Sequence, residues 1–423
     1  MFDSTIGKKY IMNYLDLLPG DIILESGKKA HSKAIQIYTK SHYSHAMICL
    51  TSRSLFHAQS QGIFTLNPQR VLVEEENDLK VLRPKKKLSE KESENIIKFL
   101  RNKVGTLYSV KEAIISGKKI RPESSQSQMQ FCSRLVAQAY LHIGHKIVEN
   151  PNFCQPAEIE NSNFFEEVPD IIRKARKEEI EFVSTKNFVL ENQISTYKWL
   201  NNTRDYAKSE FGYEKIHSQN DVMNFLKEYP EADNIVSGYI NESGYLENYK
   251  IEKDNNPWLF DADLFIKKYN YDTINIRRII DIEFENIQSY VDRIIDNYIK
   301  AAQNVEILKF NYFKLEKNLH KNRLSFIIKK YTTFIKASEY VLKGTIKDKD
   351  KCPKAINWVL EKAKELDIHN VPIKPLVQGK DLIELGFKPS KEFKEILDFA
   401  FDLQLDFHLE KEDIIKEIRE KFL

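Results

Sequence analysis

The chain has 423 residues, of which 42% are hydrophobic and 30% are charged. This length is typical of about three domains, and the composition predicts folded cores under a charged surface rather than a disordered chain. The 65 basic residues exceed the 62 acidic residues only slightly and give a net charge of +3. The overall charge therefore does not indicate a protein that binds nucleic acids or anionic membranes.

Residues 1–16 contain no uninterrupted apolar segment of the kind found in signal peptides, and no stretch approaches the ~18 consecutive apolar residues of a membrane-spanning helix. We therefore expect a cytoplasmic protein without a transmembrane segment. The cysteines Cys49, Cys132, Cys154 and Cys352 match neither a disulfide framework nor the spacing of a zinc site. We expect reduced thiols, no metal and no cofactor.

The first part of the chain shows the pattern of a small antiparallel sheet. Short apolar runs between polar turns predict strands at residues 22–24, 44–50, 55–59, 63–64, 71–73 and 80–83, and a helix at residues 33–38. Ser89 has Glu92 three positions later. This is the pattern of a capping box, and it predicts a helix that starts at Ser89 and reaches about residue 103.

A cysteine stands at the start of the next predicted helix. Leu135, Val136, Ala139 and Tyr140 recur at helical spacing after Cys132, and the residues around the cysteine are polar. The positive end of the helix dipole stabilises a thiolate and can lower the pKa of a thiol from ~8.5 to about 3.5–7.5. This pattern predicts a nucleophile at Cys132, and the alternative is an unreactive buried thiol.

A cysteine nucleophile needs a general base within hydrogen-bond reach and a third group that orients the base. His45 and His57 lie on two neighbouring predicted strands. If these strands pair, the two rings can lie side by side and face the cysteine helix. The alternative for each histidine is a buried position in the core.

Four segments follow one another in the order found in a known enzyme family, at residues 18–23, 43–48, 105–108 and 131–136. Together they resemble the circularly permuted branch of the NlpC-type papain-like cysteine hydrolases, the YiiX-like group, which is related to the lecithin:retinol acyltransferase-like proteins. Residues 155–162 also resemble the segment that follows the cysteine helix in this group. The resemblance implies an α+β papain-like domain over residues 1–178, in which a small antiparallel sheet packs against the cysteine helix.

The same resemblance implies a role for each candidate residue of the site. Cys132 corresponds to the nucleophile and His45 to the general base. His57 occupies the position of the orienting residue, where family members often have a carboxylate, and Gln59 is its rival. The candidates for the oxyanion site or the pocket wall are Tyr108, Ser133 and Gln59. The backbone N–H of Cys132 is a further expected oxyanion donor.

The rest of the chain is predicted to be mostly helical. Residues 179–270 are rich in Asn, Tyr, Glu and Lys and predict a small mixed α/β or irregular helical region of unknown role. Residues 271–348 predict long amphipathic helices, because apolar side chains recur every three or four positions and residues 258–343 contain no glycine or proline.

The last predicted unit covers residues 349–423. Its pattern is a helix, a glycine turn and a second helix after Pro389. This pattern, with Gln404 and Leu405 in the next helix, resembles the C-terminal helical element of CCA-adding enzymes and related tRNA nucleotidyltransferases. The resemblance brings no catalytic residues, because the chain shows no counterpart of the catalytic head domain of those enzymes.

These observations support two classes of function. In the first, a cysteine hydrolase cleaves an amide, ester or thioester through an acyl-thioester on Cys132, and the helical half recognises or tethers the substrate. In the second, the papain-like domain is a non-catalytic adaptor and the helical half binds RNA or a protein. An acyltransferase of the lecithin:retinol acyltransferase-like type is a further alternative. The presence of both Cys132 and His45 favours the hydrolase.

Overall fold

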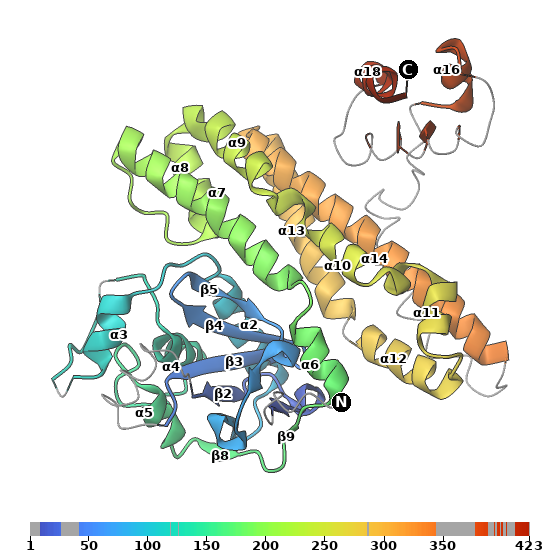
Figure 1. Cartoon of the computed structure of the whole chain (residues 1–423). Helices are drawn as coiled ribbons and strands as arrows, with labels where there is room; N and C mark the ends of the chain where they lie inside the picture. The colour runs from blue at the N-terminus through green and yellow to red at the C-terminus, as the bar shows by residue number, and fades with distance from the viewer. Residues whose placement is uncertain are drawn as a thin grey trace. The chain divides into compact units, whose positions relative to one another are not determined.

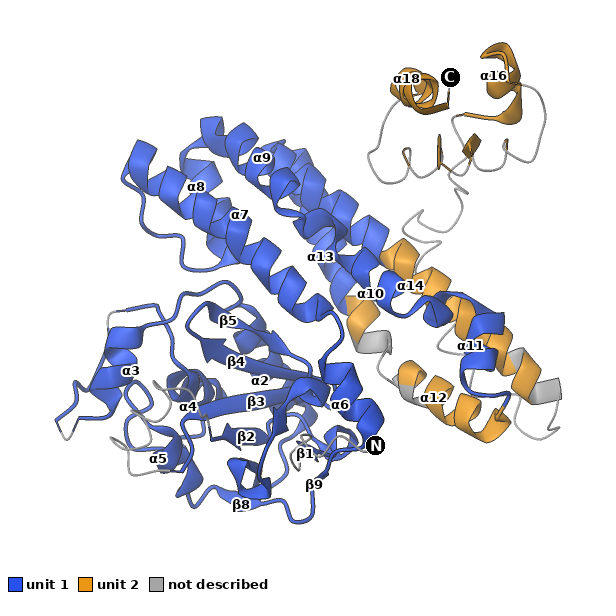
Figure 2. Cartoon of the chain, in the orientation of Figure 1, with its two compact units in different colours: residues 1–271, 293–323 blue, residues 272–292, 324–423 orange. Residues whose placement is uncertain are grey.

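The computed structural model describes residues 9–26, 42–118, 120–125, 127–285, 287–343, 377–387 and 411–422, and the single positions 393, 396, 397, 399, 400 and 403. The predicted helix at residues 33–38, Cys352, Pro389, Gln404 and Leu405 lie outside the described residues. The chain divides into two compact units (Figure 2), of which one comprises residues 1–271 and 293–323 and the other comprises residues 272–292 and 324–423.

The first unit contains a six-stranded antiparallel sheet (Figure 1) with the strand order β5-β4-β3-β2-β7-β8. Its strands are β2 (Ile22–Glu25), β3 (His45–Thr51), β4 (Ser54–Gln59), β5 (Gly62–Leu66), β7 (Leu79–Pro84) and β8 (Phe165–Glu167). The strand expected at residues 71–73 lies elsewhere. This strand, β6 (Leu72–Val73), joins β1 (Tyr10–Met12) and β9 (Ile172–Lys174) in a second, three-stranded sheet that the sequence pattern did not indicate.

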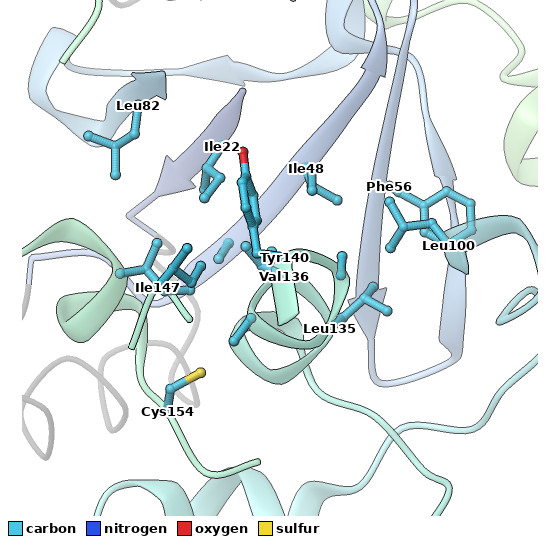
Figure 3. Packing of buried hydrophobic residues seen from close by; sticks show 14 of the residues in the cluster. Ile22, Ile48, Phe56, Leu82, Leu100, Leu135, Val136, Tyr140, Ile147 and Cys154 are labelled. Atoms are coloured by element: carbon cyan, nitrogen blue, oxygen red, sulfur yellow. The ribbon is translucent and has the colours of Figure 1, made fainter. Parts of the chain in front are cut away.

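The alternation of side chains along β3 and β4 separates two cores. Ala46, Ile48 and Phe56 point to a core shared with the helices α2 (Glu90–Arg101) and α4 (Cys132–His142), as Figure 3 shows for Ile48 and Phe56. Met47 and Leu55 point to the opposite core. The capping box predicted at the start of α2 is confirmed, because the backbone N–H of Ser89 donates to Oε2 of Glu92 at 2.8 Å.

A turn at residues 19–21 ties the main sheet to the cysteine helix. Gly20 has a φ of +93°, and a Cβ there would lie 2.5 Å from Cδ1 of Leu88. The hydroxyl of Tyr140, on α4, donates to the Gly20 carbonyl. The fully buried Asp21 accepts two hydrogen bonds from Arg83 of β7, at 2.9 and 2.7 Å. The turn therefore fixes the position of α4 on the sheet.

The first unit continues as a set of helices. They are α6 (Lys177–Val183), α7 (Phe188–Phe211), α8 (Val222–Glu228), α9 (Asp233–Ser243), α10 (Ile251–Asn255) and α11 (Ala262–Lys268). Residues 179–270 are all described and contain no strand, so this region is helical rather than mixed α/β. Its core is aromatic and aliphatic and includes Trp199, Phe225 and Tyr312. Asn187 caps α7, and Gly212 ends it with a φ of +61°.

Three long helices follow, as the apolar periodicity predicts. They are α12 (Thr273–Glu285), α13 (Ile287–Leu308) and α14 (Asn311–Lys343). Of these, the second unit contains α12, residues 287–292 of α13 and residues 324–343 of α14. It also contains α16 (Gly379–Glu384) and α18 (Lys411–Phe422), which share a core that includes Leu382, Ile414 and Ile418. None of the described helices combines the length and the hydropathy that crossing a lipid bilayer requires.

Candidate active site

Cys132 is the first residue of α4, and its side chain is 6% exposed. The apolar stripe that predicted this helix is buried against the main sheet (Figure 3), where Leu135, Val136 and Tyr140 contact the core side chains. Phe131 is the N-cap residue and makes no side-chain capping bond. The backbone N–H groups of the first turn of a helix have no partner within the helix, and a reacting carbonyl oxygen at Cys132 can use them.

Arg134 anchors the start of the cysteine helix from inside the protein. Its side chain is fully buried, and its guanidinium donates to Oε2 of Glu112 at 2.8 Å and to the carbonyl of Asn152 at 2.7 Å. The guanidinium also lies 4.6 and 4.9 Å from the ring centres of Phe131 and Phe153. The pattern around Cys132 does not indicate a role for Arg134. The signal for it is a charged residue at a buried position of an otherwise apolar helix.

His45 and His57 meet across β3 and β4. Nε2 of His45 lies 3.2 Å from Nδ1 of His57, and the ring centres are 5.4 Å apart. Burial lowers the pKa of His45 to about 4. Burial and the neighbouring charge of His45 lower the pKa of His57 to about 3. Both imidazoles are therefore neutral at pH 7, and each has one donor and one acceptor nitrogen.

The sulfur of Cys132 lies beside the first residues of β3. Burial raises the pKa of the Cys132 thiol, whereas the backbone N–H groups of Ala46 and Ser133 act in the opposite direction by bonding to the sulfur. Ala46 directly follows His45 in β3, so the cysteine helix and the histidine strand approach each other at this point. The helix start was expected to lower the pKa of the thiol, but burial has the larger effect.

Tyr108 is held next to the residues that precede the cysteine. It forms a parallel bridge with Gln130, in which the N–H of Gln130 donates to the carbonyl of Leu107 at 3.0 Å and the N–H of Ser109 donates to the carbonyl of Gln130 at 2.8 Å. Burial and the charge of a nearby Cys132 thiolate raise the pKa of Tyr108. Its hydroxyl therefore stays protonated and can donate a hydrogen bond.

The remaining candidates occupy different places. Ser133 is buried, and its hydroxyl donates to the carbonyl of Cys154 at 2.7 Å. The Cys154 thiol is buried and has a raised pKa because of this burial and the charge of Glu158. Gln59 is exposed at the end of β4, where it pairs with Gly62. The structure thus brings His57, rather than Gln59, to the ring of His45.

Within the described residues, no group of three or more His, Cys, Asp or Glu side chains could hold a metal ion. Residues 1–8, 27–41 and 344–376 are among those outside this search. The cysteines within these parts, Cys49, Cys132 and Cys154, are all free thiols.

Comparisons with known proteins agree with the resemblance of the N-terminal part. Residues 16–196 match the family model of the permuted papain-like amidases of the YaeF/YiiX type, the C92 family. A solved structure, that of the metalloprotein yiiX from Escherichia coli O157:H7, is 17% identical and aligns with 36% of this chain and 95% of that chain, with a TM-score of 0.29. No curated protein matches the chain. The part of the chain up to residue 196 is thus similar to permuted papain-like amidases, and the resemblance of the C-terminal element to tRNA nucleotidyltransferases lies outside this match.

Proposed function

We propose that the protein is a cysteine hydrolase that cleaves an amide bond through an acyl-thioester on Cys132. His45 acts as the general base and His57 orients it. The observation that carries this proposal is the position of the Cys132 sulfur beside the N–H of Ala46, next to a histidine whose ring contacts a second histidine at 3.2 Å. The match to permuted papain-like amidases supports the same type of reaction.

The contact between the two histidines supports one arrangement of their protons. Nε2 of His45 faces Nδ1 of His57, so Nδ1 of His45 is the ring nitrogen that can accept a proton from the thiol. This requires His45 to carry its own proton on Nε2 and to donate it to Nδ1 of His57. His57 then carries its proton on Nε2. The pair works in this way only while His57 is neutral, and its pKa of about 3 satisfies this condition.

The pKa values imply a neutral resting pair. Burial raises the pKa of Cys132 and lowers that of His45, so the thiol keeps its proton in the empty site. The proton moves to Nδ1 of His45 as the sulfur attacks the substrate carbonyl carbon. Nδ1 of His57 then accepts a hydrogen bond from the Nε2–H of the resulting His45 imidazolium. It stabilises this cation less than a carboxylate would.

Attack forms a tetrahedral intermediate with a negatively charged oxygen. The backbone N–H of Cys132 at the start of α4 and the hydroxyl of Tyr108 are the donors proposed for this oxygen. The intermediate collapses when the C–N bond breaks and the leaving amine takes the proton from His45. Water, activated by His45, then hydrolyses the thioester and regenerates the thiol. Capture of the thioester by an alcohol or amine would give the acyltransferase alternative.

The alkylation kinetics of the individual cysteines test this proposal. The protein is treated with a limiting amount of iodoacetamide between pH 6 and 9, and modification is assigned by peptide mass spectrometry. We expect Cys132 to react faster than Cys49 and Cys154, and to lose this advantage in His45→Ala. Equal rates for the three cysteines in the wild-type protein would exclude an assisted nucleophile and would favour the adaptor alternative.

The helical half is proposed to recognise or tether the substrate. A cytoplasmic location stays a prediction.

An RNA partner rests on the resemblance of the C-terminal element alone. A filter-binding titration with tRNA at two salt concentrations tests it, since contacts to phosphates make affinity fall as salt rises. An absence of salt-sensitive binding would remove the RNA alternative.

A further inference from the structure

Helix α7 (Phe188–Phe211) contacts the sheet-containing part of the first unit, residues 9–174, at β5 and at residues 105–106. The hydroxyl of Tyr197, on α7, donates to the backbone carbonyls of Ile63 and Thr106, at 3.0 and 3.2 Å. Tyr197 is 7% exposed and Thr106 is 2% exposed, so water does not compete for these carbonyls. One buried hydroxyl therefore joins β5 to the segment that leads to Tyr108.

Two glycines allow this close approach. A Cβ at Gly62 would lie 1.9 Å from the Tyr197 hydroxyl oxygen, and a Cβ at Gly105 would lie 2.6 Å from Cδ2 of Leu200. Arg204 donates from Nη2 to the carbonyl of Gly105 at 2.6 Å. Tyr197, Leu200 and Arg204 are spaced by three and four residues, so they share one face of α7. This face contacts Gly105 and Thr106 through all three side chains.

The contacted segment continues to the nucleophile through backbone hydrogen bonds. Thr106 is followed by Leu107 and Tyr108, which form the parallel bridge with Gln130. Gln130 stands two residues before Cys132. A displacement of residues 104–106 would therefore move Tyr108 and the chain that enters α4.

We infer that Tyr197 is a positioning residue for the thiol site, acting through the segment Thr106 to Tyr108 and its bridge to Gln130. This inference rests on the proposed function of Cys132. It gives the helical part of the first unit a role in the chemistry: contacts made through α7 set the geometry around the sulfur.

The test compares two tyrosines of the same helix. Tyr197→Phe removes the hydroxyl that bonds to Ile63 and Thr106. Tyr206→Phe is the matched control, because the ring of Tyr206 packs on Phe211 and Tyr239 within the helical core. Both variants are made in the full-length chain, and their thermal unfolding is measured so that rates are compared only where the protein is folded.

We expect Tyr197→Phe to slow the alkylation of Cys132 by iodoacetamide about three- to tenfold, as the loss of one buried hydrogen bond can do. We expect the midpoint of its pH profile to rise by about half a pH unit, because displaced donors stabilise the thiolate less. Tyr206→Phe should match the wild-type protein in both respects. A lowered melting temperature with an unchanged rate and pH profile would show that Tyr197 is only structural and would overturn the inference.

A double variant tests the route of the effect. If Tyr197 acts through Tyr108, then adding Tyr197→Phe to Tyr108→Phe slows alkylation no further. If the double variant is instead slowed by the product of the two single effects on the alkylation rate, this route is overturned. If Tyr197→Phe does not fold, Arg204→Lys replaces it with the same expectation, because lysine loses the planar donor to Gly105 and keeps the charge. A wild-type Cys132 that reacts no faster than Cys154 would instead overturn the proposed function, and this inference with it.

Discussion

Two polar pairs in the first unit each contain a buried histidine, but they are built differently. His45 and His57 come from neighbouring strands, with their rings in contact at 3.2 Å. Glu316 and His320 lie one turn apart on α14, with Nε2 of the histidine 3.4 Å from Oε2 of the glutamate. Within the described chain, Oε1 of Glu316 and Nδ1 of His320 have no hydrogen-bond partner.

The difference shows that burial of a histidine with a partner does not by itself make an active site. The pair on α14 is fixed by the spacing of one helix, and its near neighbours include the tyrosines Tyr245 and Tyr312. The strand pair lies where a separate element, α4, brings a thiol beside Ala46. A reaction needs groups delivered from several elements to one point, and of the two pairs the strand pair is the one that a thiol-bearing helix start approaches.

The largest expected effect concerns the nucleophile. We expect Cys132→Ala to lower the rate of acyl-enzyme formation from p-nitrophenyl acetate at least about 10³-fold, since it removes the attacking atom. Glu316→Gln should keep the wild-type rate within about twofold. The measurement is the burst of p-nitrophenol in stopped-flow absorbance. Loss of the burst in Glu316→Gln with the fold intact would contradict the contrast between the two pairs.

The second prediction concerns the pH dependence of the free energy of unfolding, to which His57 contributes. His57 has a pKa of about 3 in the folded protein, against an ordinary value of 6.5. Above pH 6.5 both states hold a neutral imidazole, and below it the unfolded chain binds a proton that the folded protein does not. His57 alone should therefore lower the free energy of unfolding by about 4 kcal/mol as the pH drops from 7 to 3.

Urea unfolding at several pH values measures this loss. His57→Phe should show a shallower fall below pH 6.5, because it removes a group that protonates only on unfolding. An equal slope in His57→Phe and in the wild-type protein would mean that His57 contributes nothing to the acid sensitivity.

A smaller effect is expected from the orienting residue. His57→Phe removes the acceptor for the Nε2–H of His45 and should lower the alkylation rate of Cys132 about 10- to 100-fold. His57→Asn keeps an acceptor oxygen and should lose less. The two rates are compared by peptide mass spectrometry at pH 8. If the asparagine variant is as slow as the phenylalanine variant, hydrogen-bond acceptance is not the role of His57.

The smallest effect should come from replacing the pair on α14. We expect Glu316→Leu with His320→Leu to change the free energy of unfolding by no more than about 2 kcal/mol in either direction, since apolar side chains often substitute for a buried polar pair. The burst with p-nitrophenyl acetate should be unchanged. Urea unfolding and the burst assay give both values, and a lost burst in a folded variant would count against a purely structural pair.

The sequence predicted those parts of the site that depend on local patterns. The alternation in β3 and β4, the capping box of Ser89 and the apolar stripe after Cys132 are each visible within a short window. Strand pairing then brings His45 to His57 without further information. The N-terminal resemblance supplied the remaining roles, and the family match bears out that resemblance.

Features that depend on distant segments could not be predicted in this way. β1 and β9 have three residues each and pair across the whole papain-like part, so neither has a periodic signal. The pKa of Cys132 rises because of burial, and a sequence does not show how deeply a helix start is covered. The helices of residues 179–270 were ambiguous because short apolar runs there alternate with Asn-rich and Tyr-rich segments.

The contact of α7 with residues 62–63 and 105–106 bears on how the protein can be divided for study. The family match ends at residue 196, one position before Tyr197 and within a helix that extends to Phe211. A fragment cut at this boundary would lose Tyr197, Leu200 and Arg204 together, and would leave the carbonyl of Gly105 without the donor from Arg204. A fragment that keeps these contacts therefore extends beyond the family boundary to the end of α7, and a shorter fragment would report on a disturbed surrounding of Cys132.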